Sequence, residues 1–180
     1  MLLFMGKIAC ATGHRPDKFD FGYNETDIRC INLKKCLKRE LIKLIEHDYT
    51  HFISGMALGF DMWFAEEVLE LKKTYPNIIL EAAIPCLNQE GTWPKSSRER
   101  YQYIKEKADI VTLLSKTKYS PYLMIKRDEY MVDKSDMVVA CFNGSKGGTA
   151  HTFSYAIDKG VNIIHINPDK KTINYVKNRR

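Results

Sequence analysis

A glycine-rich stretch at residues 141–153, CFNGSKGGTAHTF, has the composition of an anion-binding turn. An apolar run at residues 137–142 leads into it, and a helix is predicted to follow. Glycines let a backbone approach a phosphate closely, and the free N–H groups at a helix N-terminus point at the anion. The turn offers three glycines, a side-chain amide, two hydroxyls and one cation: Gly144, Gly147, Gly148, Asn143, Ser145, Thr149 and Lys146. The spacing matches neither the Walker loop nor the dinucleotide fingerprint, so a plain tight turn remains the alternative interpretation.

Polar or glycine-containing segments also follow three other stretches that are predicted to be strands. They are Gly13-His14-Arg15 after the first strand, Ser54-Gly55 after the second and Pro85 after the third. The carboxyl ends of parallel strands lie at one edge of a sheet, and ligands bind in the crevice beyond that edge. We therefore expect these segments to meet the glycine-rich turn around one ligand.

The elements that must position these residues alternate between strands and helices. Strands are predicted at residues 6–12, 50–54, 78–84, 110–114, 136–142 and 161–166. Helical spacing or capping residues separate them, with helices expected at about 26–47, 61–75, 96–108, 121–134 and 149–159. Continuous apolar strands that alternate with helices predict an α/β fold, a single-domain parallel sheet with helices on both faces.

Length and composition fit one domain with its own core, because the chain has 180 residues and an ordinary share of apolar ones. The five cysteines are scattered and form no CxxC pair, which argues against a zinc site or a disulfide framework and favours the cytoplasm. The apolar runs are too short to cross a bilayer, and residues 1–5, although apolar, make a poor secretion signal. No metal, cofactor or membrane partner is expected.

The net charge of +6 is concentrated at the C-terminus. Residues 169–180 hold five basic side chains against one acidic one, which leaves +2 for the rest of the chain. A basic C-terminal tail of this kind is typically solvated. Nucleic-acid binding is therefore an alternative that the charge does not favour.

Several side chains have both a ligand-binding and a structural interpretation. His14 and Arg15 could contact a base, ribose or phosphate; the alternative is an Arg15 that braces the loop and a His14 that is exposed. Asp61 could cap a helix or bind a ribose hydroxyl. Trp93 could stack on a base or pack inside the protein. Glu90 is the loop carboxylate most available for catalysis, and a solvated acid is its alternative.

Several motifs resemble those of known nucleotide-binding families. The sequence SGMALGFD at residues 54–61 and GGTA at residues 147–150 resemble motifs of DprA proteins. The sequence MIKR at residues 124–127, followed by the Gly-Gly-Thr turn, resembles LOG proteins, the nucleotide phosphoribohydrolases. Both families belong to the SLOG superfamily of Rossmann-like nucleotide binders. With TGHRP at residues 12–16 and the IPC segment at residues 84–86, the chain from 6 to 168 is most similar to the YpsA-like SLOG proteins of bacteria and phages.

The resemblance implies a role for Arg127, but one residue of the LOG pattern is absent from this chain. Arg127 matches the LOG arginine that faces the ligand phosphate or ribose, with a surface ion pair as the other interpretation. The LOG pattern also requires a glutamate three residues after Thr149, where this chain has Thr152. A hydroxyl cannot act as a base or stabilise an oxocarbenium ion as a carboxylate does. Hydrolysis would then need Glu90 or Glu66 beside Arg127.

We therefore expect a Rossmann-like SLOG domain over residues 6–168, followed by the basic tail at 169–180. Its partner would be a nucleotide-derived phosphorylated molecule, such as a nucleotide, an ADP-ribose-like compound or a cyclic nucleotide signal. The protein would act as a sensor, sequestering module or regulator, and a homodimer or higher homo-oligomer is compatible with the sequence. A LOG-type nucleotide N-glycosidase and a DprA-like single-stranded nucleic-acid binder are the alternatives.

Overall fold

The computed structural model describes residues 6–177, which form one α/β unit around a seven-stranded sheet. The strands are β1 (Lys7–Gly13), β2 (Tyr49–Ser54), β3 (Ile79–Ile84), β4 (Ile110–Leu113), β5 (Met137–Cys141), β6 (Asn162–Asn167) and β7 (Thr172–Val176). They lie in the order β4-β3-β2-β1-β5-β6-β7. The first six strands are mutually parallel, and β7 runs antiparallel to β6.

The strand order changes direction between β1 and β5. From β1 the chain builds outward through β2, β3 and β4, and it then returns to place β5 on the other side of β1. Gly13 at the end of β1 pairs with Cys141 at the end of β5, so the loops that follow these two strands start side by side. Adjacent parallel strands whose following connections diverge to opposite sides leave a crevice at their carboxyl ends.

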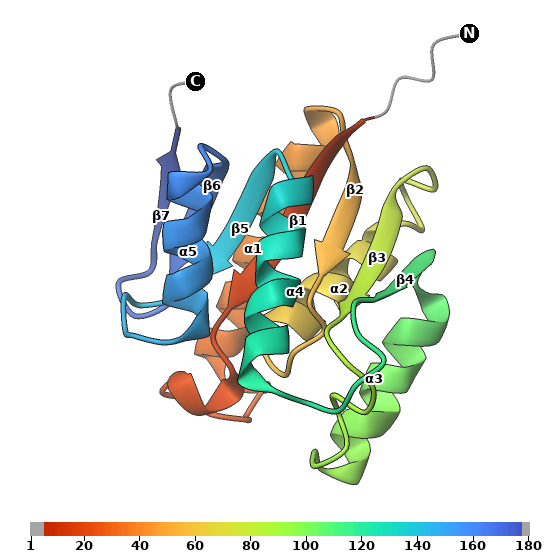
Figure 1. The fold of residues 1–180 in the computed structure, drawn as a ribbon. Coiled ribbons are helices and arrows are strands. Elements are labelled where there is room, and N and C mark those ends of the chain that lie inside the picture. The colour runs from red at the N-terminus through yellow and green to blue at the C-terminus, as the bar shows by residue number, and fades with distance from the viewer. Residues whose placement is uncertain (1–5, 178–180) are drawn as a thin grey trace, which may run out of the picture.

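Helices cover both faces of the sheet (Figure 1). The helices are α1 (Ile28–Glu46), α2 (Phe60–Leu71), α3 (Lys95–Lys107), α4 (Pro121–Lys134) and α5 (Gly148–Asp158), with a short 3-10 helix, η1 (Pro16–Lys18). In Figure 1, α4 and α5 lie in front of the sheet, while α1 and α2 lie behind it. Two separate apolar clusters, one on each face, form the core. The α/β sheet with helices on both faces, predicted from the alternating pattern, is confirmed.

The C-terminal segment differs from its expected form. Residues 169–180 were expected to be a basic tail, but residues 172–176 form β7 and pair with β6 along its whole length. Tyr175 of this strand donates a hydrogen bond to the buried Glu40 of α1 and accepts one from Lys43. The predicted domain boundary at 168 therefore falls inside the sheet. The apolar segment at residues 1–5 lies outside the described residues.

Two features are absent from residues 6–177, a membrane-spanning helix and a metal-binding cluster. Within that part of the chain, no helix is both long and apolar enough to cross a membrane. Its His, Cys, Asp and Glu side chains form no cluster of three or more that could hold a metal ion.

A buried carboxylate, Glu81 on β3, joins three elements on the α4 face of the sheet. It accepts hydrogen bonds from Thr112 and Tyr130 at 2.7 Å each, and its other oxygen lies 2.8 Å from Nε2 of His51. Burial alone would raise the pKa of Glu81, but these hydrogen bonds outweigh it and hold the pKa at about 2. Glu81 is therefore ionised in the folded protein throughout the mildly acidic range.

The pKa of Glu81 makes folding stability depend on pH below its ordinary value of 4.5. Because the folded pKa is lowered, this stabilisation is fully present above pH 5 and is lost as the pH falls toward 2. We expect Glu81→Gln to unfold more easily than wild type at pH 7, by about 2 kcal/mol, with a smaller difference at pH 2.5. Urea unfolding at both pH values measures this, with the exposed Glu106→Gln as the control; a difference independent of pH would contradict it.

Candidate ligand-binding site

A cavity of about 400 Å³ lies at the carboxyl ends of β1 and β5, where the strand order changes direction. We call it the switch-point cavity. Its walls come from the loop after β1, the start of α2, the first half of α4 and the turn before α5. The predicted residues among its lining are Gly13, His14, Arg15, Asp61, Arg127, Ser145, Gly147, Gly148 and Thr149. Residues from four distant stretches of the chain therefore share one hollow.

The glycine-rich turn presents unpaired backbone amides at this cavity. Gly147 precedes α5 with a φ of +148°, a conformation that side chains strongly disfavour, and no side chain caps the helix. His151 is the first residue whose amide bonds back into the helix, so the amides of residues 148–150 have no partner among the described residues. A side chain built at Gly147 or Gly148 would meet nothing within 4 Å. The turn thus combines free N–H donors with open space beside its two glycines.

Three cations border the switch-point cavity without an acidic partner. Arg15, Lys18 and Lys146 line it, are exposed, and form no ion pair with any residue between 6 and 177. Some other basic side chains are neutralised, for example Arg100, which binds both Glu25 and Glu66. Unpaired cations beside a concave surface raise the local concentration of anions. The lining also holds Asp17 and Asp61, so outside the Arg127–Asp128 pair three cations face two carboxyl groups, a small excess of positive charge that favours an anionic ligand.

His14 and Asn143 hold two of the cavity's loops together. Nε2 of His14 lies 2.9 Å from Oδ1 of Asn143 and 3.1 Å from its backbone N. Oδ1 of Asn143 also accepts a hydrogen bond from the amide of Ser145, and Nδ2 donates to Asp169. His14 is 5 % exposed and packs edge-on against Phe19. His14 is therefore not the exposed histidine of the alternative interpretation: it is buried, joins two loops and also lines the cavity.

Arg127 is buried in the cavity wall and is neither a surface ion pair nor a freely exposed ligand. Its Nε donates to Asp128 at 2.7 Å, and its Nη1 donates to the carbonyl of Gly55. The guanidinium lies directly on Gly55, because a Cβ added there would be 2.7 Å from Cζ of Arg127. Glycine at position 55 is therefore required by the close approach of Arg127 rather than by a ligand.

Asp61 is a buried carboxylate that faces the same cavity from the first turn of α2. Its Oδ2 accepts only a long hydrogen bond, 3.4 Å, from the amide of Ala57, while its backbone carbonyl accepts one from Ser54. Burial raises the pKa of Asp61 to about 7, although Arg127 acts in the opposite direction. Asp61 therefore exchanges a proton near neutral pH, in contact with the space where an anion would bind.

The raised pKa of Asp61 predicts that ionisation destabilises the folded protein. A carboxyl whose folded pKa exceeds its unfolded value of 3.8 takes up a proton on folding, so its contribution to stability falls as the pH rises from 4 to 7. Asp61→Asn removes this titration. We therefore expect the free energy of unfolding of the variant, relative to that of wild type, to be about 2 kcal/mol higher at pH 8 than at pH 4. Urea unfolding at both pH values measures this, with the exposed Asp17→Asn as the control. A difference in stability between Asp61→Asn and wild type that is the same at pH 4 and pH 8 would contradict it.

The remaining predicted residues lie outside the switch-point cavity. Ser54, Gly55, Pro85, Asn143 and Gly144 do not line it. Trp93 is 9 % exposed, packs edge-on against Tyr101, and lines a neighbouring cavity.

The three positions considered for hydrolysis, Glu90, Thr152 and Glu66, also lie outside the lining of the switch-point cavity. Glu90 accepts a hydrogen bond from Gln102 of α3 and lines a third hollow, so the structure does not bring it together with Arg127. Thr152, where the LOG pattern has its glutamate, is fully buried and donates to the carbonyl of Gly148. Glu66 accepts hydrogen bonds from Arg100 of α3 and does not line the switch-point cavity.

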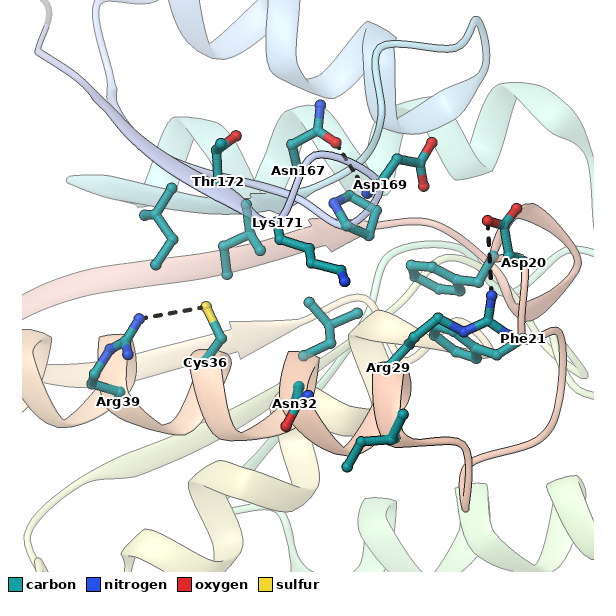
Figure 2. Close-up of a pocket in the computed structure, with 16 residues that line it drawn as sticks. Asp20, Phe21, Arg29, Asn32, Cys36, Arg39, Asn167, Asp169, Lys171 and Thr172 are labelled. Carbon is teal, nitrogen blue, oxygen red and sulfur yellow. Dashed lines mark hydrogen bonds and ion pairs between the residues drawn. The ribbon is translucent and has the colours of Figure 1, made fainter.

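Figure 2 shows a different cavity, of about 480 Å³, between α1 and the β6–β7 turn. None of its lining residues lines the switch-point cavity. Its two arginines are engaged, Arg29 with Asp27 and Asp20, and Arg39 with Glu40, while Lys171 reaches over the floor of the cavity (Figure 2). Because both of its arginines have acidic partners, we regard it as a weaker anion site than the switch-point cavity.

Sequence reasoning missed several residues that line the switch-point cavity, and four of them illustrate why. Asp128 pairs with Arg127 inside the wall, Lys18 adds charge at the rim, and Met124 and Ile125 supply apolar surface. Because Asp128 directly follows Arg127 in the sequence, it could have been identified as a candidate partner for that arginine. The position of the others depends on which face of α4 and η1 turns inward, and the residue pattern does not determine that face.

The fold places the chain in the class of Rossmann-like proteins that includes DprA. DprA from Streptococcus pneumoniae superimposes with a TM-score of 0.60 and 16 % identity, over 89 % of this chain and 50 % of that one. DprA from Helicobacter pylori, described for its single-stranded DNA binding mode, gives a TM-score of 0.60 and 18 % identity over 89 % and 65 %. The chain thus spans about half the length of the first of these proteins and two thirds of the second, and the likeness concerns the fold.

The sequence comparisons identify the family within this class. The YspA SLOG family model, named YpsA, matches residues 9–170. A UPF0398 protein of Bacillus cereus is 34 % identical over 147 residues, which cover 79 % of this chain and 78 % of that protein. A UPF0398 protein of Halalkalibacterium halodurans is also 34 % identical, over 79 % and 76 %. The chain belongs to the YpsA SLOG family, which confirms the resemblance seen in its motifs.

Proposed function

We propose that the protein binds a nucleotide-derived phosphorylated ligand in the switch-point cavity and acts as a sensor, sequestering module or regulator. The observation that carries this proposal is the convergence of unpaired amides at residues 148–150 with the unpaired Arg15 and Lys146 around one hollow. Backbone amides at a helix N-terminus and guanidinium groups are the donors that phosphate prefers in proteins. Membership of the SLOG family supports a ligand built from a nucleotide.

Binding without hydrolysis is the form of the proposal that the side chains favour. N-glycosidic cleavage requires a carboxylate that faces the ribose and stabilises positive charge. The position of the LOG glutamate holds the buried Thr152, and Glu90 lies in another hollow. Three carboxyl groups line the cavity, and of these Asp61 is buried and lies outside the Arg127–Asp128 pair. Release of free base from nucleoside monophosphates, abolished by Asp61→Asn, would therefore favour the enzymatic alternative.

Single-stranded nucleic-acid binding is a second candidate, supported by the exposed cations at the cavity rim. A polyanion would contact several of these cations at once, and its affinity would fall steeply with salt concentration. A mononucleotide held in the cavity would depend less on salt. Retention of labelled single-stranded DNA at 50 and 200 mM salt distinguishes the two.

The test of the proposed function is a thermal unfolding screen with AMP, ADP-ribose and cyclic mononucleotides. A ligand at 100 times its dissociation constant adds about 2.7 kcal/mol to the stability of the folded state. For a domain of this size we expect a midpoint increase of roughly 5–10 °C. The same ligand should give no increase with Lys146→Glu. A panel in which no nucleotide shifts the midpoint would contradict the proposal.

A further inference from the structure

A second cavity, of about 710 Å³, adjoins the switch-point cavity at the loop between β3 and α3. We call it the loop cavity. Three residues, Arg15, Tyr119 and Met124, line both hollows, so the two cavities adjoin at these side chains. A ligand whose phosphate bound at the α5 N-terminus would therefore extend past Arg15 toward the loop cavity. This is the layout of a site for a molecule with an anionic end and a second, different end.

The surface of the loop cavity suits a flat, partly apolar group. Leu87 and Tyr119 line it and are 50 % and 56 % exposed, although both are large apolar residues. Trp93, which is 9 % exposed, also lines the cavity. Aromatic and aliphatic side chains of this kind stack on or cover nucleic-acid bases. Lys118 at the rim is exposed and, among the described residues, has no acidic partner.

Gln89 gives the loop cavity a specific polar group. Its Nε2 donates to two backbone carbonyls, those of Gly55 at 3.4 Å and Met56 at 3.3 Å, which fixes the orientation of the carboxamide. The opposite orientation would set Oε1 against the same two carbonyl oxygens. Oε1 is consequently left buried and without a hydrogen bond, and the residue is 6 % exposed. A buried acceptor with no partner is costly, and it is commonly explained by a function or an absent ligand.

We propose that the loop cavity is the base subsite of the nucleotide site and that Gln89 accepts a hydrogen bond from the exocyclic amino group of the base. This inference rests on the proposed function and names its substrate class: a nucleotide with an amino-bearing base, such as AMP. Arg15 stands at the junction, between the phosphate at the glycine-rich turn and the base beside Gln89. A site built around a hydrogen-bond acceptor rejects analogues that lack the matching donor.

Calorimetric titration with three matched probes tests the inference. The probes are AMP, purine riboside 5′-monophosphate, which lacks the amino group, and ribose 5-phosphate, which lacks the base. We expect AMP to bind at least 10-fold more tightly than either of the others. Gln89→Met should remove the preference for AMP over purine riboside 5′-monophosphate and leave the affinity for ribose 5-phosphate unchanged. Gln102→Met, the same change on α3 outside both cavities, should preserve the preference.

The outcomes separate the two proposals. Equal affinity for AMP and ribose 5-phosphate would overturn the base subsite while the phosphate site stands. Equal affinity of the wild type for AMP and purine riboside 5′-monophosphate would overturn the role of Gln89, whether or not the Gln89→Met variant folds. Failure of all three probes to bind would overturn both this inference and the proposed function.

Discussion

Replacing Arg127 by methionine is expected to lower the free energy of unfolding by about 3–5 kcal/mol at pH 7. Methionine preserves much of the apolar stem but leaves Asp128, which is 8 % exposed, without its partner. It also leaves the carbonyl of Gly55 without the guanidinium that now binds it. Removing one member of a buried ion pair is destabilising chiefly because the other charge stays buried.

The pH dependence of this loss identifies its cause. Arg127 lowers the pKa of Asp61, so its removal raises that pKa further and makes ionised Asp61 more costly. The loss should therefore be larger at pH 8 than at pH 5, and Asp128→Asn in the same chain should recover part of it. Urea unfolding of the single and double variants measures both effects, with the exposed Arg98→Met as the control. A loss below 1 kcal/mol would show that Arg127 is not the charge that holds this wall together.

Replacing Arg15 by glutamate is expected to weaken nucleotide binding about 100-fold while leaving stability nearly unchanged. Arg15 is exposed and makes no side-chain hydrogen bond or ion pair with the described residues, so the fold loses no contact. In the complex it would donate charge-assisted hydrogen bonds to phosphate, each worth about 1.5–3 kcal/mol. Charge reversal adds repulsion to that loss.

The measurement for Arg15→Glu is a titration with the nucleotide that gives the largest thermal shift, run beside urea unfolding. Arg98→Glu on α3 is the matched control, because Arg98 is also exposed and unpaired but lies outside the switch-point and loop cavities. An unchanged affinity in Arg15→Glu would remove Arg15 from the site. A matching loss in Arg98→Glu would indicate that only the overall charge of the protein matters.

The position of Arg15 beside the glycine-rich turn illustrates what could be predicted from the sequence. The apolar strands at residues 6–12 and 136–142 end in glycine and polar residues, and parallel strands must place such ends at one edge of a sheet. That argument placed Gly13, Arg15 and the glycine-rich turn correctly beside one another, and the structure has them around one cavity.

What could not be predicted depends on long-range packing. The MIKR sequence holds two adjacent basic residues and does not indicate which of them turns inward. In the structure Arg127 packs against Gly55, whereas Lys126 is half exposed and bound to Glu129. The segment TINYV at residues 172–176 alternates in polarity like a strand, but the lysines around it made it resemble a tail. Its pairing with β6 and the hydrogen bond from Tyr175 to Glu40 hold this segment in the sheet as a strand.

Chemical shifts of the backbone amides, followed while AMP is added to ¹⁵N-labelled protein, test the central claim most directly. If the unpaired amides of the α5 N-terminus hold the phosphate, the largest changes should fall at residues 146–150, with a second group at residues 13–15. Ribose 5-phosphate should reproduce the first group. Saturable changes confined to the cavity of Figure 2, at residues 28–39 and 166–173, would instead show that the ligand binds elsewhere and would contradict the account.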